Sequence, residues 1–240
     1  MESKDNYERF FWSVEDKHFW FKGRQDLIKR FIPNENIKIL DVGCASGGNL
    51  KSLDPRHDLY GIDLSREAIK TAKERGLKKV FVADAENFPF KNNEFDLIIC
   101  SDLLEHVKDD QIVLNEIYRV LKKDGKAIIG VPAFNFLWTR FDEINRHYRR
   151  YTKKRFKSMI KNTNFKIKRF SYWNFSVFLP VFLIRYLRRN GIFKTERYDI
   201  EIPNKFINTM LTKIIKFENL LITKGFKFPF GVSLITILEK

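Results

Sequence analysis

Short apolar runs alternate with segments of helical spacing through the first half of this 240-residue chain. The apolar runs predict strands at residues 37–42, 58–63, 79–83, 95–100 and 125–131, and the segments between them predict helices at 48–53, 65–75 and 109–123. Ser65 suits the N-cap of the second helix, and Asp109 or Asp110 suits that of the third. Apolar strands that alternate with helices predict an α/β fold, in which helices cover both faces of a mostly parallel sheet.

The two ends of the chain follow other patterns. Residues 5–32 predict helices rich in aromatic side chains. The second half predicts an aromatic and basic loop at 132–151, a helix at 152–161, a strand at 165–173, an apolar and then basic segment at 174–189, an irregular stretch at 190–203, a helix at 204–224 and a last strand at 232–238. We therefore expect a helical cap before the alternating core and a further set of elements after it.

The composition is that of an ordinary globular protein, with 44% hydrophobic and 31% charged residues. The two cysteines, Cys44 and Cys100, form no metal-binding or redox spacing, which suits a reducing compartment. The polar N-terminus resembles no signal peptide, and the longest apolar stretch, residues 173–184, is shorter than the roughly 20 residues that span a bilayer. We therefore expect a cytoplasmic protein.

The net charge of +15 is concentrated in one part of the chain. Residues 140–194 hold 16 Lys and Arg against two Asp and Glu. A basic block beside a neutral remainder indicates an anionic partner, such as a lipid surface, a phosphorylated substrate or a nucleic acid. The alternative is a solvated basic face with no partner.

The most informative stretch is the small-residue turn that follows the first strand. The run Ile39-Leu-Asp-Val-Gly-Cys-Ala-Ser-Gly-Gly-Asn-Leu50 places Asp41 at the strand end, followed by Gly43, Ala45, Gly47 and Gly48. Small residues let the backbone approach a ligand at the carboxyl end of a buried strand, where open α/β sheets bind nucleoside-like cofactors.

Two cofactors fit such a turn. Gly43-x-Ala45-x-x-Gly48 is a degenerate dinucleotide fingerprint, and Asp63, 20 residues beyond Gly43, could bind a ribose diol of either cofactor. Asp41 distinguishes them, because its carboxylate would repel a pyrophosphate but suits the ammonium and sulfonium groups of S-adenosylmethionine. Asp84, after the third strand, can accept a hydrogen bond from an adenine amino group while the backbone of Ala85 meets the ring edge. The residues thus favour S-adenosylmethionine over a nicotinamide cofactor.

Five motifs in order resemble those of class I S-adenosylmethionine-dependent methyltransferases. They are Ile39-Leu-Asp-Val-Gly-Cys-Ala-Ser-Gly47, Tyr60-Gly-Ile-Asp-Leu-Ser65, Asp84-Ala85, Phe95-Asp-Leu-Ile-Ile-Cys-Ser-Asp-Leu-Leu-Glu-His-Val107 and Arg119-Val-Leu-Lys-Lys-Asp-Gly-Lys-Ala-Ile-Ile129. Ala45 departs from the usual Gly, but it is small enough to keep the turn. The flanking motifs Glu15-x-x-His18-Phe-Trp-Phe-x-x-Arg24, Trp138–Tyr151 and Pro229-Phe-Gly-Val-Ser-Leu resemble a type 11-like subgroup of small-molecule enzymes often linked to cell-surface sugar or lipid pathways.

The resemblance implies a Rossmann-like, doubly wound sheet of seven strands, the last of them antiparallel. It implies one methyltransferase domain over residues 1–240, with a helical cap at 1–34, a cofactor-binding core at 35–131 and substrate-side elaborations, including a helical insertion, at 132–240. It also implies contacts to the cofactor from the turn, the ribose acid, the adenine site and the fourth strand, at Gly43, Cys44, Ala45, Gly47, Asp63, Leu64, Asp84, Ala85 and Ser101.

The aromatic cap offers candidates for a lid. Tyr7, Trp12, Phe19 and Trp20 could cover the cofactor, and Arg24 could pair with its methionine carboxylate. The alternative is that the aromatic side chains simply pack a helix against the sheet. A charged residue on an apolar helix usually has a partner, which favours a binding role for Arg24.

Two histidines are candidates for proton transfer or acceptor binding. His106 follows the fourth strand, and Asp102-x-x-Glu105-His106 has a spacing found in some metal-assisted members of the class. A full metal site needs a further ligand that the sequence does not identify, so we predict no metal. The alternative is that Glu105 and His106 have a structural role and stabilise their loop. His147 follows the fifth strand and is the stronger candidate for the base.

The segment around His147 carries the predicted acceptor contacts. These are Trp138, Arg146, Arg149, Arg150 and Tyr151, whose guanidinium groups could hold a phosphate or carboxylate. A basic surface loop without a ligand is the alternative. Residues 173–189 and 204–224 could lie on an anionic membrane, or could form a substrate lid or a dimer interface.

The sequence therefore predicts methyl transfer to oxygen of a small or lipid-linked acceptor, with possible peripheral membrane contact. The first alternative is a nucleic-acid (RNA) methyltransferase, which the net charge supports. Against it, the sequence Ser101-Asp-Leu-Leu follows the fourth strand, where an amine-methylating enzyme would have an Asn/Asp-Pro-Pro-aromatic motif. A non-catalytic binding subunit of the same fold is the second, and a nicotinamide dehydrogenase the third. The acceptor's identity and the oligomeric state stay open.

Overall fold

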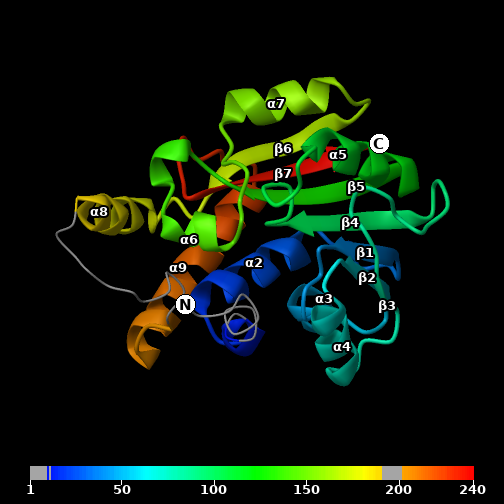
Figure 1. Ribbon diagram of the computed structural model, residues 1–240, viewed down its shortest axis with the longest axis horizontal. Helices are drawn as coiled ribbons and strands as arrows, with labels where there is room; N and C mark the ends of the chain where they lie inside the picture. Colours follow the sequence, from blue (N-terminus) through cyan, green and yellow to red (C-terminus); the bar gives the residue numbers. More distant parts are fainter. Residues whose placement is uncertain (1–9, 11, 191–201) are drawn as a thin grey trace.

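The computed structural model describes residue 10, residues 12–190 and residues 202–240 (Figure 1). Its centre is a seven-stranded sheet in the order β3-β2-β1-β4-β5-β7-β6. The strands are β1 (Lys38–Val42), β2 (Asp58–Asp63), β3 (Val80–Val82), β4 (Phe95–Ser101), β5 (Leu121–Pro132), β6 (Lys166–Trp173) and β7 (Ser233–Glu239). The first five pair in parallel, and β7 lies antiparallel between β5 and β6. This confirms the predicted Rossmann-like sheet and its antiparallel last strand.

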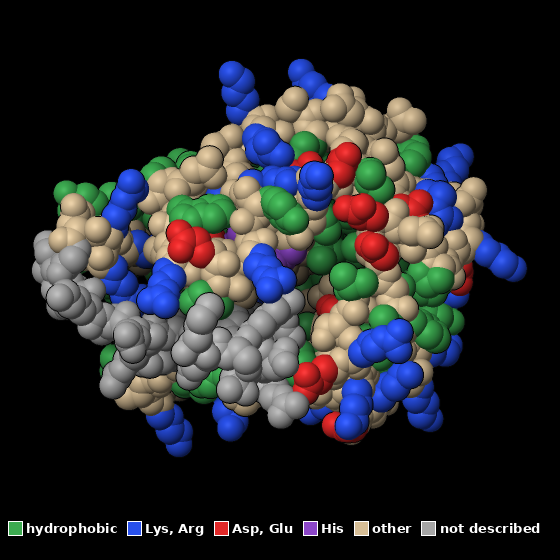
Figure 2. All heavy atoms as spheres, viewed as in Figure 1, with side chains coloured by type: hydrophobic (Ala, Val, Ile, Leu, Met, Phe, Trp, Pro, Cys, Tyr) green, Lys and Arg blue, Asp and Glu red, His purple; other side chains and the backbone are tan. Residues whose placement is uncertain are grey.

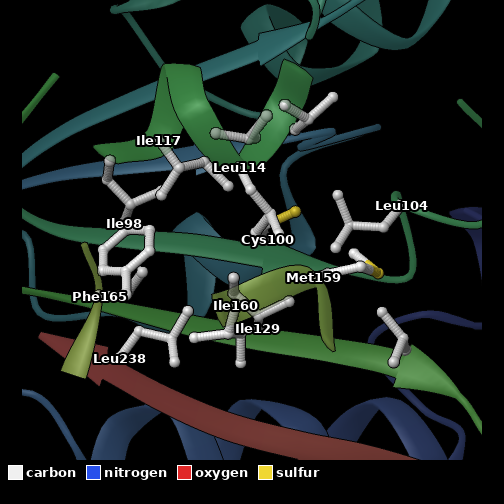
Figure 3. Close-up of a cluster of buried hydrophobic side chains, with 14 of the residues drawn as sticks. Ile98, Cys100, Leu104, Leu114, Ile117, Ile129, Met159, Ile160, Phe165 and Leu238 are labelled. Carbon is white, nitrogen blue, oxygen red and sulfur yellow. The ribbon is translucent and has the colours of Figure 1, made fainter. Parts of the chain in front are cut away.

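Helices cover both faces of the sheet. The helices are α2 (Phe19–Arg30), α3 (Gly48–Ser52), α4 (Arg66–Glu74), α5 (Asp110–Val120), α6 (Arg140–Ile144), α7 (Lys153–Lys161), α8 (Phe178–Arg189) and α9 (Lys205–Thr223). Side chains from α5 and α7 pack on one face, where they form the large core cluster drawn in Figure 3. Helices α2, α3, α4 and α9 pack on the other face. The central strands are buried from both sides, as their continuous apolar runs require.

One predicted boundary is wrong. The helix predicted at 109–123 ends at Val120, and Leu121 begins β5. Leu121 pairs with Phe95 and is fully buried, so its side chain belongs to the sheet core. Asp124 has a φ of 62°, and the register between β4 and β5 shifts between Phe95 and Leu97, so regular pairing resumes at Lys126. Helical and strand patterns are indistinguishable where an apolar helix end runs directly into an apolar strand.

The predicted loop at 132–151 contains regular structure. It holds a short 3₁₀ turn, η1 (Asn135–Leu137), and the five-residue helix α6. A capping box begins α6, since the Asp142 carboxylate accepts a hydrogen bond from the Thr139 amide at 2.8 Å. The predicted irregular segment at 190–203 falls mostly outside the described residues, as does Tyr7.

Helix α9 fixes the position of α2. Asn219, fully buried on α9, donates to the Gly23 carbonyl at 2.8 Å and accepts from the Trp173 indole at 2.8 Å. A Cβ atom on Gly23 would lie 2.5 Å from Ile215 Cγ2, so the close approach of the two helices requires glycine there. Within the described residues, no helix combines the length and the apolar composition needed to cross a membrane.

Candidate active site

The carboxyl ends of the parallel strands open into a cavity of about 1260 Å³. Figure 2 shows histidine side chains at the base of a hollow on this face, with acidic side chains gathered along its right edge. The predicted site residues that line the cavity are Arg24, Gly43, Cys44, Ala45, Asp63, Leu64, Asp84, Ala85, Ser101, His106, Arg146, His147 and Arg150. Residues from the cap, the central strands and the segment after β5 thus meet around one space.

The turn after β1 has the backbone geometry that its small residues predicted. Gly43, Ala45 and Gly47 all have positive φ, of 72°, 45° and 82°. The Ala45 amide donates to Asp63 Oδ2 at 2.9 Å, and the Ser65 amide donates to Asp63 Oδ1 at 2.8 Å. These two bonds fix the Asp63 carboxylate at the end of β2, facing the cavity.

Gly47 has a conformational role. It does not line the cavity; it is the left-handed N-cap of α3, and a Cβ atom there would collide with Leu77. Gly47, which the sequence predicts as a cofactor contact, thus shapes the turn between β1 and α3.

Asp41 lies behind the cavity wall, where burial disfavours its ionised form. Its side chain is 1% exposed, and neither carboxylate oxygen accepts a hydrogen bond from the described residues. Burial raises the pKa of Asp41 to about 7, against the opposing effect of the Arg24 charge. Arg24 lines the cavity and donates to Asp102 Oδ2 at 2.9 Å, while its buried Nε has no hydrogen-bond partner among the residues that the structure describes. At this end of the cavity, the described residues thus leave the Asp41 carboxylate without a hydrogen-bond donor and the Arg24 Nε–H without an acceptor.

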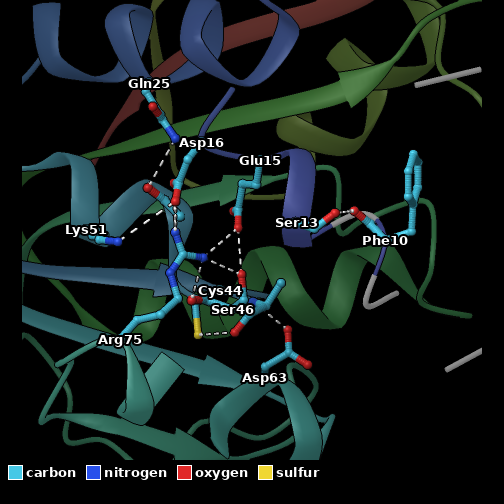
Figure 4. A network of polar contacts seen from close by, with 12 residues as sticks. Phe10, Ser13, Glu15, Asp16, Gln25, Cys44, Ser46, Lys51, Asp63 and Arg75 are labelled. Atoms are coloured by element: carbon cyan, nitrogen blue, oxygen red, sulfur yellow. Dashed lines mark hydrogen bonds and ion pairs between the residues drawn. The ribbon is translucent and has the colours of Figure 1, made fainter. Parts of the chain in front are cut away.

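A polar network attaches the N-terminal cap to the turn (Figure 4). Arg75, just after α4, donates to Glu15 Oε2 at 3.0 Å and to Asp16 at 2.7 Å. The Ser46 hydroxyl, within the turn, donates to the same Glu15 oxygen at 2.6 Å. Glu15 is 2% exposed, so this contact is shielded from water. Three of the predicted lid residues, Trp12, Phe19 and Trp20, line the cavity.

Two histidines face each other across the cavity base. The rings of His106 and His147 lie edge to face, with centroids 4.5 Å apart. Nδ1 of His147 lies 2.9 Å from Asp142 Oδ1, and Arg150 forms two further hydrogen bonds to the Asp142 carboxylate, at 2.8 and 3.1 Å. Burial alone would raise the pKa of Asp142, but the bonds from His147 and Arg150 hold that pKa at about 2.

This arrangement determines the tautomers of both rings. Because Asp142 is ionised, Nδ1 of His147 carries the hydrogen, and its lone pair lies on Nε2. Nδ1 of His106 lies 2.9 Å from the Asn145 carbonyl oxygen, which can only accept. His106 therefore also carries its hydrogen on Nδ1.

The same residues could hold a divalent metal ion. Ligand atoms of Glu105, His106 and His147 all lie within 4.8 Å of one another. Glu105 is 1% exposed, and in the described part of the chain its Oε2 has no hydrogen-bond partner. Burial raises the pKa of Glu105 well above its usual value. Two imidazoles and one carboxylate are a known ligand set for transition metals. His147 is the additional ligand that the spacing Asp102-x-x-Glu105-His106 could not identify.

Three predicted acceptor residues do not line the cavity. Tyr151 is fully buried, and its hydroxyl donates to Asp110 Oδ2 at 2.9 Å. Arg149 pairs with the same carboxylate at 2.9 Å and donates to the Lys108 carbonyl at 2.7 Å. Trp138 lies outside the cavity lining and packs edge to face with His147, with ring centroids 6.4 Å apart. Arg149 and Tyr151, which the sequence predicts as acceptor contacts, attach this segment to the start of α5.

Several cavity residues were missed by the sequence analysis. Val181, Ile184, Arg185 and Arg188 of α8 form part of the wall. The apolar and basic composition of residues 174–189 was the available signal, but the sequence does not show which side of the helix faces inward. Asp142 was also missed as the partner of His147, although the two are only five residues apart.

The comparisons with known proteins agree with this geometry. Residues 40–129 match the family model described as a methyltransferase domain. An uncharacterized protein of Methanocaldococcus jannaschii is 31% identical over 169 residues, which are 68% of this chain and 78% of that protein. A demethylmenaquinone methyltransferase of Anoxybacillus flavithermus is 34% identical over 115 residues, covering 44% of this chain and 48% of the relative.

Solved structures share the fold. An S-adenosylmethionine-dependent methyltransferase from Archaeoglobus fulgidus has a TM-score of 0.61 at 16% identity, over 97% of this chain and 99% of that one. A phosphoethanolamine N-methyltransferase of Haemonchus contortus, solved with S-adenosylmethionine bound, has a TM-score of 0.58 at 22% identity, over 90% of this chain and 52% of that one. These likenesses show the fold. The ordered motifs, the matched family model and the relative that is 31% identical establish that the chain belongs to the class I S-adenosylmethionine-dependent methyltransferases.

Proposed function

We propose that this enzyme transfers a methyl group to an oxygen atom of a small or lipid-linked acceptor that carries an anionic group. The observation that carries the proposal is the Asp142–His147 pair at the cavity base, which leaves the Nε2 lone pair of His147 available to take a proton. Methyl transfer to a hydroxyl needs such a base, whereas a tertiary or unprotonated amine acceptor does not.

The residues at the other end of the cavity fit S-adenosylmethionine. In this proposal Asp63, which is fixed by two backbone amides, accepts hydrogen bonds from the ribose hydroxyls, and Asp84 with Ala85 meets the adenine edge; all three residues line the cavity. Arg24 Nε, which has no hydrogen-bond partner among the described residues, suits the methionine carboxylate, and Asp41 in its ionised form favours the ammonium group. When bound, the cofactor supplies an electrophilic methyl group on a sulfonium.

The proposed reaction is a single displacement. The acceptor oxygen forms a bond to the methyl carbon as the carbon–sulfur bond breaks and its electron pair returns to sulfur. The hydroxyl proton moves to Nε2 of His147, and the ionised Asp142 stabilises the resulting imidazolium through Nδ1. The His106 ring packs edge to face with the His147 ring, with centroids 4.5 Å apart, and so restricts its orientation. The cap and α8 exclude water, because their side chains complete the cavity wall.

The wall nearest the base favours an acceptor that is both anionic and apolar. Arg146, Arg185 and Arg188 bring positive charge to the cavity, and Val181 and Ile184 add apolar surface beside them. The names of two relatives support a small-molecule acceptor, since one is a demethylmenaquinone methyltransferase and another, from Arabidopsis thaliana, a phosphoethanolamine N-methyltransferase; the second name gives nitrogen as the methylated atom.

Tritium-labelled methyl transfer tests the proposal. The enzyme is incubated with labelled S-adenosylmethionine and either a lipid extract or total RNA, and the label is followed into the organic and RNA fractions. We expect transfer into the organic-soluble fraction, lost in His147→Gln and kept in His57→Gln, which removes a histidine far from the cavity. Label that appears instead in RNA, with salt-dependent binding, would establish the nucleic-acid alternative that the net charge of +15 favours.

A further inference from the structure

Helix α8 presents an apolar face that no other part of the described chain covers. Leu179, Leu183 and Tyr186 recur at helical spacing and are 70%, 51% and 54% exposed. The opposite face of α8 is well packed, with Val181 and Phe182 lying against a small cluster that includes Leu137 and Val232. The exposed side chains are therefore not needed to hold the helix in place.

Helix α9 repeats this arrangement. Phe206, Met210 and Phe217 lie on one side of the helix and are 79%, 43% and 63% exposed. Its other side is buried against α2, through Ile215 and Asn219 among others. The two helices are neighbours, since Leu211 of α9 packs on the same cluster as Val181 and Phe182 of α8. In Figure 1 they form the left and lower-left margin of the molecule.

The charges on these two helices are almost all positive. The basic residues are Arg185, Arg188, Arg189, Lys205, Lys213 and Lys216, and the one acidic residue is Glu218. The Glu218 carboxylate is 1% exposed and is occupied by hydrogen bonds from the Phe175 and Ser176 amides, at 3.0 and 3.1 Å. Four of the basic residues, Arg189, Lys205, Lys213 and Lys216, are exposed, so the described surface of α8 and α9 combines apolar side chains with basic ones.

We infer that α8 and α9 form a docking surface for an anionic lipid bilayer, into which Leu179, Leu183, Phe206, Met210 and Phe217 insert. Amphipathic helices with basic and large apolar side chains lie in the plane of the membrane interface, where buried apolar area and attraction to anionic headgroups add together. A second copy of this surface is a poor occupant, because it would bring two positively charged faces together.

The docking surface adjoins the mouth of the active-site cavity. Val181, Ile184, Arg185 and Arg188 of α8 line that cavity, while Leu179 and Leu183 lie on the outer side of the same helix. An acceptor held in the bilayer would thus reach the cavity along α8. The docking itself rests on the surface alone and does not depend on the proposed acceptor.

Flotation of the full-length protein with vesicles tests this inference. We expect binding to vesicles that contain phosphatidylglycerol, little binding to pure phosphatidylcholine, and weakening by salt. The double variant Leu179→Ser/Leu183→Ser and the charge variant Lys213→Glu/Lys216→Glu should each weaken binding by at least about tenfold. Affinity for S-adenosylhomocysteine, measured by calorimetry, should not change, so the docking surface and the active site are tested separately.

Matched controls make the test specific. Phe81→Ser removes an exposed aromatic side chain from β3, at the far edge of the sheet, and Lys154→Glu/Lys161→Glu reverses two exposed charges on α7. Both controls should bind vesicles as the parent protein does. The inference is overturned if no vesicle binds the protein, if the control and surface variants lose binding equally, or if the surface variants instead abolish a dimer seen by light scattering.

Discussion

Asp142 gives His147 its chemical role, because the ionised carboxylate fixes the hydrogen on Nδ1 and leaves the lone pair on Nε2. We predict that Asp142→Asn lowers the rate of methyl transfer by roughly 100-fold or more while leaving S-adenosylhomocysteine affinity unchanged. Single-turnover kinetics and calorimetry measure the two quantities. Glu143→Gln, an exposed neighbour on α6, is the control. A variant that loses cofactor binding and rate together would mean that Asp142 only supports the fold.

Asp41 makes the stability of the protein without cofactor depend on pH. Its pKa is about 7 in the folded chain against 3.8 in the unfolded one, so the folded state binds more protons between these values. The free energy of unfolding therefore falls as pH rises through this window, and Asp41 destabilises the fold by roughly 4 kcal/mol above pH 7. We predict that Asp41→Asn unfolds at higher urea concentration than the parent at pH 8, and that this advantage shrinks toward pH 5. Equal differences at both pH values would contradict the prediction.

At the scale of elements, the close contact between α2 and α9 depends on Gly23, which has no side chain. We predict that Gly23→Ala lowers the free energy of unfolding by roughly 1–3 kcal/mol, because the new Cβ lies 2.5 Å from Ile215 Cγ2. Urea denaturation measures the change. Adding Ile215→Leu, which removes the Cγ2 branch that the new Cβ meets while keeping a similar side-chain volume, should recover part of the loss. If the second substitution makes the loss larger, crowding at this contact is not the cause.

The cap is joined to the turn by Arg75, and this contact makes a second prediction at the same scale. Arg75→Ala leaves the buried Glu15 carboxylate without its cationic partner and should lower the free energy of unfolding by about 3 kcal/mol. It should also weaken cofactor affinity, since Trp12 and Phe19 of the cap line the cavity. Arg56→Ala, in an exposed pair with Asp54, should change neither quantity. Unfolding and calorimetric titration check both, and unaltered cofactor affinity in Arg75→Ala would show that the cap does not help hold the cofactor.

The sequence identified elements well where burial made the pattern simple. Strands β1 and β2 follow their predicted ranges to within a residue, since both faces of the sheet are covered and their apolar runs are continuous. The end of α5 was missed because Val120 and Leu121 are apolar in either structure. The Asp142–His147 pair was not predictable, because Arg146, with φ of 55°, reverses the chain between them and no periodic pattern reports such a turn.

At the scale of the whole molecule, the cavity draws residues from the cap, the central strands and α8. A ligand there should therefore stabilise the chain as one unit, as the predicted single domain requires. At about 100 times its Kd, a ligand adds about 2.7 kcal/mol, which corresponds to roughly 5–10 °C in the unfolding temperature of a chain this size. We predict one calorimetric transition that S-adenosylhomocysteine shifts upward by this amount.

Asp63→Ala should remove the shift, because the carboxylate that faces the cavity is gone. Asp58→Ala, on the same strand but paired with exposed Lys79 at its other end, should keep it. Two transitions, of which the ligand moves only one, would divide the chain into separately folding parts and contradict the single domain. An equal shift in both variants would mean that the ligand is held without Asp63, and the assignment of the ribose site would then be wrong.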